Sequence, residues 1–124
     1  MNVIEELLNS GADINISDKN NFTLLMTFVQ KGDLEIVKTL LSNGASVNTQ
    51  DLSSMTALDY AIKSKQLEIA KLLVKNGANI TSDNYMLAIE SNFKELVLFF
   101  DSLDPDKHIF LKDKLKYPYI VKNH

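Results

Sequence analysis

Apolar residues recur at helical spacing in short segments that are separated by polar, glycine-containing stretches. The first ten residues place four apolar side chains on one face of a helix: Val3, Ile4, Leu7 and Leu8. The same pattern predicts three helix pairs, over 24–30 with 34–41, 56–64 with 67–75, and 85–91 with 94–101. Helices this short are marginal alone in water and persist only by packing on neighbours. The pattern therefore predicts an all-α protein made of stacked helix pairs.

The chain repeats itself with a period of 33 residues, so that residues 18–50 correspond to 51–83. Eleven residues of the first unit recur in the second: Asp18, Thr23, Leu25, Leu34, Glu35, Ile36, Lys38, Leu40, Asn43, Gly44 and Ala45. A fixed period in this range is typical of stacked repeat architectures. Residues 1–17 match only the second half of the unit. The chain thus opens in mid-repeat, either as an end cap or as part of a longer protein.

Polar residues between the helices predict caps and projecting turns. Thr23 and Asp33 stand at N-cap positions, where their side-chain oxygens can accept orphan backbone N–H groups. Residues 18–21 form the tip of a short extended finger with a β-turn, and 46–55 form the second finger. Lys65 occupies the position of Gly32 in the preceding unit. We therefore expect a positive φ at Lys65, at a cost of about 1 kcal/mol.

The last unit, residues 84–103, is a truncated capping repeat. Ala61 matches Ala88 at a spacing of 27, so six residues are missing, and we place the loss in the finger. Asn92 lies at the turn between its two helices. A shortened terminal unit is typical of a capping repeat. Residues 104–124 form a tail with one more expected helix over 106–116. We expect the tail to cover the last repeat; the alternative is a partner-binding segment.

Composition excludes several classes of function. The 124 residues carry a net charge of −3, and all 13 basic residues are Lys, so there is no electrostatic case for nucleic acid or anionic membrane. Arg, the residue best suited to bidentate phosphate contacts, is absent. Cys is also absent, which excludes disulfides and thiolate metal sites. The apolar runs are too short to span a bilayer, and no signal peptide is present, which predicts a cytoplasmic protein.

Candidate catalytic groups are few. His108 and His124 lie in the tail, and neither has a spaced partner acid or nucleophile. The four Gly form no phosphate loop, and no residues have metal-ligand spacing, so no cofactor is expected. Asp18 and Asp51 are finger positions with structural or solvated roles. Asp59 is either a buried acid or a hydrogen-bonded structural residue, and we favour the second. The sequence predicts a protein that is not an enzyme.

Three in-phase segments carry a family resemblance. TALDYA at 56–61, LEIAKLL at 67–73 and NGANI at 76–80 resemble an ankyrin repeat, as do TLLM at 23–26, GDLEIV at 32–37 and GASVN at 44–48. The half unit ends with GADIN at 11–15, and the resemblance covers residues 1–103. The chain departs from the family's Thr-Pro-Leu-His: Leu24 and Ala57 replace Pro, and Met26 and Asp59 replace His. Losing Pro at the first helical position should cost some stability.

The resemblance implies a curved solenoid of about 3.5 repeats plus the tail. Its concave face, made by finger tips and first helices, would bind another protein. Positions that differ between units are free to be chosen for a partner, and they give ten candidate binding residues: Lys19, Asn20, Phe22, Gln30, Lys31, Leu52, Ser53, Met55, Lys63 and Ser64. Among the apolar candidates, Phe22 and Met55 are also expected to pack against a neighbouring finger, whereas Leu52 lies at a tip.

These candidates combine apolar finger positions with a lysine pair on the first helices. They predict a partner with an acidic surface and an apolar pocket, bound by a chain that is monomeric alone. The main hypothesis is a protein-binding module, such as an adaptor. The alternative is an immunity- or antitoxin-type inhibitor that masks a toxin or enzyme, as small ankyrin-type immunity proteins do by family analogy. An enzyme is the distant third hypothesis.

Overall fold

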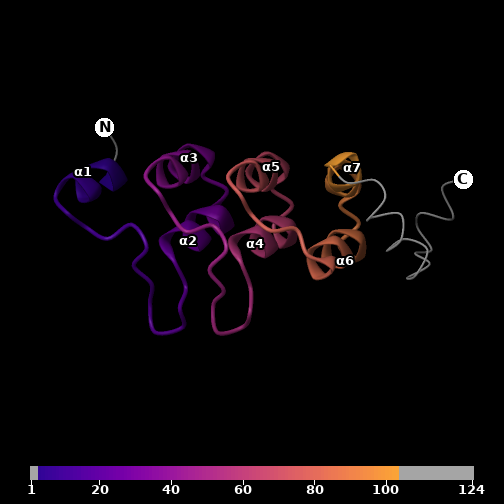
Figure 1. The fold of residues 1–124 in the computed structure, drawn as a ribbon, viewed down its shortest axis with the longest axis horizontal. Coiled ribbons are helices and arrows are strands. Elements are labelled where there is room, and N and C mark those ends of the chain that lie inside the picture. The colour runs from indigo at the N-terminus through magenta and orange to yellow at the C-terminus, as the bar shows by residue number, and fades with distance from the viewer. Residues whose placement is uncertain (1–2, 104–124) are drawn as a thin grey trace, which may run out of the picture. The chain divides into compact units, whose positions relative to one another are not determined.

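A computed structural model describes residues 3–103, and the tail expectations lie outside them. The described residues form seven helices and are otherwise loops, apart from one isolated antiparallel bridge between Ser17 and Thr23 (Figure 1). The helices are α1 (Val3–Asn9), α2 (Leu24–Lys31), α3 (Leu34–Ser42), α4 (Ala57–Lys63), α5 (Leu67–Lys75), α6 (Ser82–Glu90) and α7 (Lys94–Leu103). This all-α architecture confirms the predicted fold class. The chain divides into two compact units, and the boundary lies between Asn79 and Ile80.

The first unit is two helices deep. Helices α2 and α4 contact each other in one layer, and α3 contacts both α1 and α5 in the other (Figure 1). The two helices of each repeat also contact each other, α2 with α3 and α4 with α5. Two long loops project beyond α2 and α4, on the side away from α3 and α5. These loops are the predicted fingers, and we call residues 18–22 finger 1 and residues 51–55 finger 2.

The core of the first unit is built from positions that recur at the 33-residue period. Leu25 and Leu58 are both buried, and so are Leu40 and Leu73. Between residues 5 and 79, the other buried apolar residues are Met26, Val29, Val37, Ala57, Ala61, Ile62, Ile69, Ala70 and Ala78. Because these side chains come from adjacent helix pairs, no pair could bury its apolar face alone. Stacking therefore supplies the stability that single short helices lack.

Side-chain caps fix where the first helices begin. The Thr23 hydroxyl accepts from the Met26 N–H at 3.2 Å, and the Thr56 hydroxyl accepts from the Asp59 N–H at 3.3 Å. The Asp59 carboxylate accepts in return from the Thr56 N–H at 3.0 Å, which completes a capping box. The hydrogen-bonded structural role that we favoured for Asp59 is thus confirmed. Asp33 caps α3 through the Ile36 N–H at 3.2 Å, as predicted.

Asparagine side chains connect the loops of successive repeats in the first unit. The Asn15 Oδ1 atom accepts from the Ser46 N–H at 2.8 Å, and the Asn48 Oδ1 atom accepts from the Asn79 N–H at 2.9 Å. Both acceptors come from the Asn that closes each repeat motif. The bonds hold neighbouring loops in register, so the fingers that follow them are positioned relative to each other.

The second unit contains α6 and α7, which contact each other. Tyr85 and Phe100 are fully buried, with ring centroids 6.5 Å apart, and the Tyr85 hydroxyl donates to the Asp101 carboxylate at 3.0 Å. The Asn92 φ of 57° makes the turn between the helices, at the position that the sequence indicated. The helix pair predicted over 85–91 and 94–101 is therefore present.

Helix α6 begins at Ser82, three residues before the predicted start. Its N-cap is Thr81, so four positions separate Gly77 from this cap, whereas twelve separate Gly44 from the equivalent Thr56. The connection has lost eight residues, and α6 is two residues longer than α4. The net difference is the six residues seen in the sequence. The third finger is therefore absent altogether.

Lys65 has a φ of 54°, as predicted from its match to Gly32. Lys65→Gly is expected to raise the free energy of unfolding by up to about 1 kcal/mol, because a residue with a Cβ is strained in the left-handed region. Urea denaturation of the two proteins measures the difference. Ser64→Gly is the matched control, since Ser64 has an ordinary φ of −93° and glycine there should give no gain. An equal gain in both variants would contradict strain at Lys65 as the cause.

Candidate functional site

Each finger is a tight turn held by its own aspartate. In finger 1, the Asp18 Oδ1 atom accepts from the Asn20 N–H at 2.8 Å and the Phe22 N–H at 3.0 Å. The Asn21 N–H donates to the Asp18 carbonyl at 2.9 Å, which closes a β-turn. Asn21 has a positive φ of 60°, a conformation that asparagine tolerates better than most residues. Of the structural and solvated roles predicted for Asp18, these bonds support the structural one.

Finger 2 repeats this geometry with a second set of residues. The Asp51 Oδ1 atom accepts from the Ser53 N–H at 2.8 Å and the Met55 N–H at 3.0 Å. The Ser54 N–H donates to the Asp51 carbonyl at 2.9 Å. Unlike exposed Asp18, Asp51 is buried. The base of finger 2 is therefore more firmly enclosed than that of finger 1.

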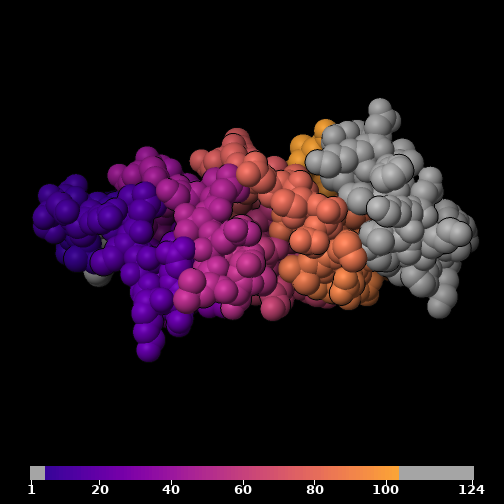
Figure 2. All heavy atoms as spheres, turned by 60° about the horizontal axis from the view of Figure 1, so that its bottom comes forward, coloured from indigo at the N-terminus to yellow at the C-terminus, as the bar shows by residue number. Residues whose placement is uncertain are grey.

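The two fingers are joined by hydrogen bonds. The Leu52 N–H donates to the Asn20 carbonyl at 2.9 Å, and the Asn21 side-chain amide donates to the Gln50 carbonyl at 2.6 Å. In the space-filling view, the indigo-violet residues of the first finger project from the body of the first unit (Figure 2). Paired in this way, the fingers form one rim rather than two independent loops.

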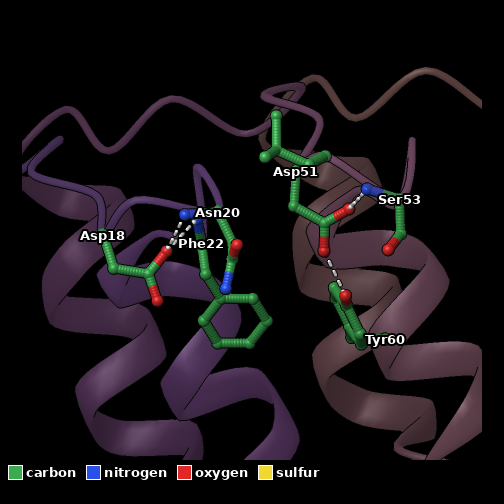
Figure 3. A pocket seen from close by; sticks show the side chains of 7 residues that line it. Asp18, Asn20, Phe22, Asp51, Ser53 and Tyr60 are labelled. Atoms are coloured by element: carbon green, nitrogen blue, oxygen red, sulfur yellow. Dashed lines mark hydrogen bonds between the residues drawn. The ribbon is translucent and has the colours of Figure 1, made fainter.

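Tyr60 connects this rim to the first helices, and sequence reasoning missed it. From α4, its hydroxyl donates to the Asp51 carboxylate, and its ring meets the Phe22 ring edge-on with centroids 5.4 Å apart at 73° (Figure 3). Phe22 therefore packs its ring against a helix residue, where we had expected a neighbouring finger. The equivalent of Tyr60 in the preceding unit is Thr27. This difference between units was the available signal.

The Tyr60–Asp51 pair is electrostatically matched. Burial raises the pKa of Tyr60 to about 12, helped by its hydrogen bond to Asp51 and by the negative charges of Asp51 and Asp59. Burial alone would raise the pKa of Asp51, but hydrogen bonds from Tyr60 and from the Met55 and Ser53 N–H groups lower it overall. At neutral pH the pair is thus a neutral phenol donating to a carboxylate.

Two hollows meet at Tyr60. One is a pocket of about 390 Å³ between the fingers, lined by Asp18, Asn20, Phe22, Asp51, Leu52, Ser53 and Tyr60. The other, also about 390 Å³, is lined by Gln30, Tyr60, Lys63 and Ser64 at the carboxyl ends of α2 and α4. Both hollows lie in the first unit and share Tyr60 as a lining residue, so we treat them as one candidate surface. We call it the finger–helix groove, and we include exposed Lys31, which neighbours Gln30 in sequence.

Seven of the ten residues proposed from the sequence line these hollows: Asn20, Phe22, Gln30, Leu52, Ser53, Lys63 and Ser64. Lys19, Lys31 and Met55 line neither of them. Lys19 and Lys31 are exposed, and Met55 is half-buried. Tyr60, Asp18 and Asp51 also line the hollows and were not among the ten; structural or solvated roles had been predicted for the two aspartates.

Leu52 is the most exposed large apolar side chain among the described residues, with 73% of its surface accessible. It lies at the tip of finger 2 and adds nothing to the core. Its backbone N–H, in contrast, is fixed by the bond to Asn20. Single exposed leucines are common on protein surfaces, but this one has a backbone that the neighbouring finger holds in place.

Two lysines of the second helices form ion pairs, and the two lysines at the ends of the first helices form none with the described part of the chain. On the second helices, Lys38 pairs with Glu35 at 3.8 Å and Lys71 with Glu68 at 4.0 Å. On the first helices, Lys31 and Lys63 are exposed, and neither has an ion pair with another residue of 3–103. The two ammonium groups on the first helices are therefore not held by an ion pair within residues 3–103.

A comparison with protein families decides what this architecture is. A family model of three ankyrin repeats matches residues 1–84. The chain belongs to the ankyrin-repeat family. Ankyrin repeats are in general non-enzymatic modules for protein–protein interaction. A search of curated protein sequences finds no match to this ankyrin-repeat chain.

Other features of this ankyrin-repeat protein can be stated for residues 3–103. None of the helices described there is long and apolar enough to cross a membrane. Within the same range, no three His, Cys, Asp or Glu side chains come together in a way that could hold a metal ion.

Tyr60→Phe is expected to change how stability depends on pH at both extremes. Because folding raises the pKa of Tyr60, its contribution is complete below pH 10 and is lost as the pH rises from 10 to about 12. The free energy of unfolding of the variant should not show this decrease between pH 10 and 12, because phenylalanine does not ionise. Without the phenol donor, the pKa of Asp51 should rise from its lowered value, so stability falls earlier on acidification.

NMR titration of the Asp51 carboxyl group, with urea midpoints from pH 9 to 12, measures both effects. The difference between wild type and variant isolates Tyr60 from the other tyrosines. An unchanged Asp51 titration in Tyr60→Phe would contradict the hydrogen bond.

Proposed function

We propose that this ankyrin-repeat protein binds a partner protein in the finger–helix groove of its first unit. The observation that carries the proposal is Leu52, held at a hydrogen-bonded fingertip with 73% of its surface in water. An interface anchor contributes most when the contacts around it exclude water. The rim and the helix ends would supply those surrounding contacts.

The partner chemistry follows from the two halves of the groove. Leu52 and the half-buried Phe22 ring supply apolar surface at the fingers. Lys31 and Lys63 supply positive charge at the helix ends, without ion pairs among the described residues. The negative charges of Asp18 and Asp51 are directed to backbone N–H groups. We therefore propose a partner with an apolar pocket beside an acidic surface.

Both an adaptor that docks a client and an inhibitor that masks a toxin or enzyme would use this groove in the same way. In either case the protein contributes binding and no chemistry of its own. The two differ in what the partner does after binding: an inhibitor abolishes the partner's activity at stoichiometric amounts, whereas an adaptor leaves it intact.

The double variant Lys31→Glu/Lys63→Glu tests the groove. Capture from the protein's own cell extract, compared between baits by quantitative mass spectrometry, identifies proteins that this variant loses. Affinity for such a protein should fall mainly through a slower association rate, and the wild-type rate should weaken with added salt.

The matched control is Lys38→Glu/Lys71→Glu, which makes the same change in net charge on the second-helix layer. Both variants are checked for folding by urea denaturation. A partner that is retained by the groove variant and lost by the control variant would contradict the groove assignment.

A further inference from the structure

One backbone carbonyl in finger 1 accepts a hydrogen bond from the next finger, and the equivalent carbonyl in finger 2 has no donor among the described residues. In finger 1, the Asn20 carbonyl accepts from the Leu52 N–H of the next finger at 2.9 Å. The equivalent carbonyl in finger 2, 33 residues later, belongs to Ser53. No described residue donates a hydrogen bond to it. Ser53 itself is exposed. We call this unpaired position of finger 2 the open edge.

The connection that would form a third finger, between Gly77 and Thr81, is too short to pair with this edge. Aligning Gly44 with Gly77 and Thr56 with Thr81 removes the eight residues that correspond to 48–55. The counterpart of Leu52, which would donate to Ser53, is among the missing residues. Among residues 3–103, finger 1 therefore has a hydrogen-bonded neighbouring finger on its C-terminal side, and finger 2 has none.

The open edge is ordered and has an apolar side chain next to it. The Asp51 carboxylate fixes the turn through the Ser53 and Met55 N–H groups, and the Gln50 side-chain amide donates to the Ser54 carbonyl at 3.3 Å. Leu52 lies directly before Ser53 and is 73% exposed. A ligand at this edge would therefore meet a preorganised carbonyl beside an apolar group, which lowers the entropic cost of binding.

We infer that a loop of the partner protein takes the place of the missing third finger, donating a backbone N–H to the Ser53 carbonyl. The inference rests on the proposed function, since it assumes a protein partner. Continuity with the existing finger–finger interface specifies the occupant: a tight turn with a free N–H at its tip and an apolar side chain against Leu52. Backbone pairing of this kind extends an existing edge with a segment from another chain.

A peptide copied from finger 2 is the probe. The peptide SVNTQDLSSMT, the sequence of residues 46–56, is titrated into the ¹⁵N-labelled protein and compared with the same peptide N-methylated at its leucine amide. We expect shifts centred on Ser53 and Ser54, and roughly three- to tenfold weaker binding of the methylated peptide, the loss of one neutral hydrogen bond. Equal binding of the two peptides, shifts elsewhere, or no shifts up to the solubility limit would each overturn the inference.

A second variant tests the same edge from within the chain. A copy of residues 48–55 inserted after Ile80 restores the missing finger, and a Gly/Ser insertion of equal length is the matched control. The finger insertion should abolish peptide binding, whereas the Gly/Ser insertion should retain it. Retention by a folded finger insertion would overturn the inference. If that variant fails to fold, the peptide pair decides alone.

The open edge and the lysines of the groove can fail independently of each other. If Lys31→Glu/Lys63→Glu loses the partner while the two peptides bind equally, the proposed function stands and the open-edge inference falls. If the peptides differ as expected while those lysines do not matter, the edge stands and the groove assignment falls. Concentration-dependent dimerisation in sedimentation experiments, removed by the finger insertion, would make a second copy the occupant and overturn the assignment to a partner loop.

Discussion

Asp51→Ala is expected to lower the free energy of unfolding by about 2–3 kcal/mol, because three hydrogen bonds converge on this buried carboxylate. The Ser53 and Met55 N–H groups and the Tyr60 hydroxyl would all lose their acceptor. Finger 2 should also lose its fixed turn, so partner binding should fall with stability. Urea denaturation measures the first effect.

Asp18→Ala is the matched control for this change. Asp18 accepts the equivalent two backbone bonds in finger 1, but it is exposed and is not bonded to a tyrosine. We expect a loss of about 1 kcal/mol there, since exposed hydrogen bonds contribute less. Equal losses in the two variants would mean that burial and Tyr60 add nothing to finger 2.

Leu52→Ala is expected to weaken partner binding by about 2 kcal/mol, or roughly 30-fold, while stability stays within about 0.5 kcal/mol of wild type. Binding should change without a matching change in stability, because a side chain that is 73% exposed contributes little to folding. Calorimetric titration and urea denaturation on the same preparation provide both numbers. Most of the change should be in the dissociation rate.

Leu98→Ala controls for the loss of any exposed leucine. Leu98, in α7 of the second unit, is 67% exposed, so the two truncations remove similar surface. We expect Leu98→Ala to bind normally. Comparable weakening by both variants would point to general surface apolarity instead of an anchor at the fingertip.

The repeat predicted the helices well because a fixed period constrains every unit at once. Thr23, Thr56 and their partners define the helix starts, and Lys65 shows a backbone conformation that was inferred from Gly32 alone. The start of α6 could not be obtained in this way. The match of Ala61 to Ala88 gives only the net difference in length between the two units. The shorter loop and the longer helix change that length in opposite directions, so the sequence does not separate them.

The candidate site was less predictable from the sequence than the fold. Positions that vary between units do identify exposed groups such as Leu52 and Lys63. Tyr60 was missed because a tyrosine beside buried helix positions resembles core, and only the folded chain brings it against Phe22 and Asp51. The unpaired Ser53 carbonyl was not predicted either, although the sequence had placed the loss of six residues in the finger that would pair with it.

The location of the partner on the first unit is the central claim, and hydrogen–deuterium exchange tests it most directly. Amide exchange would be compared between the protein alone and the protein saturated with a captured partner. We predict slower exchange in residues 18–22 and 51–55 and at the carboxyl ends of α2 and α4, with α3 and α5 unchanged. Protection confined to α3 and α5, with both fingers exchanging as in the free protein, would contradict the claim.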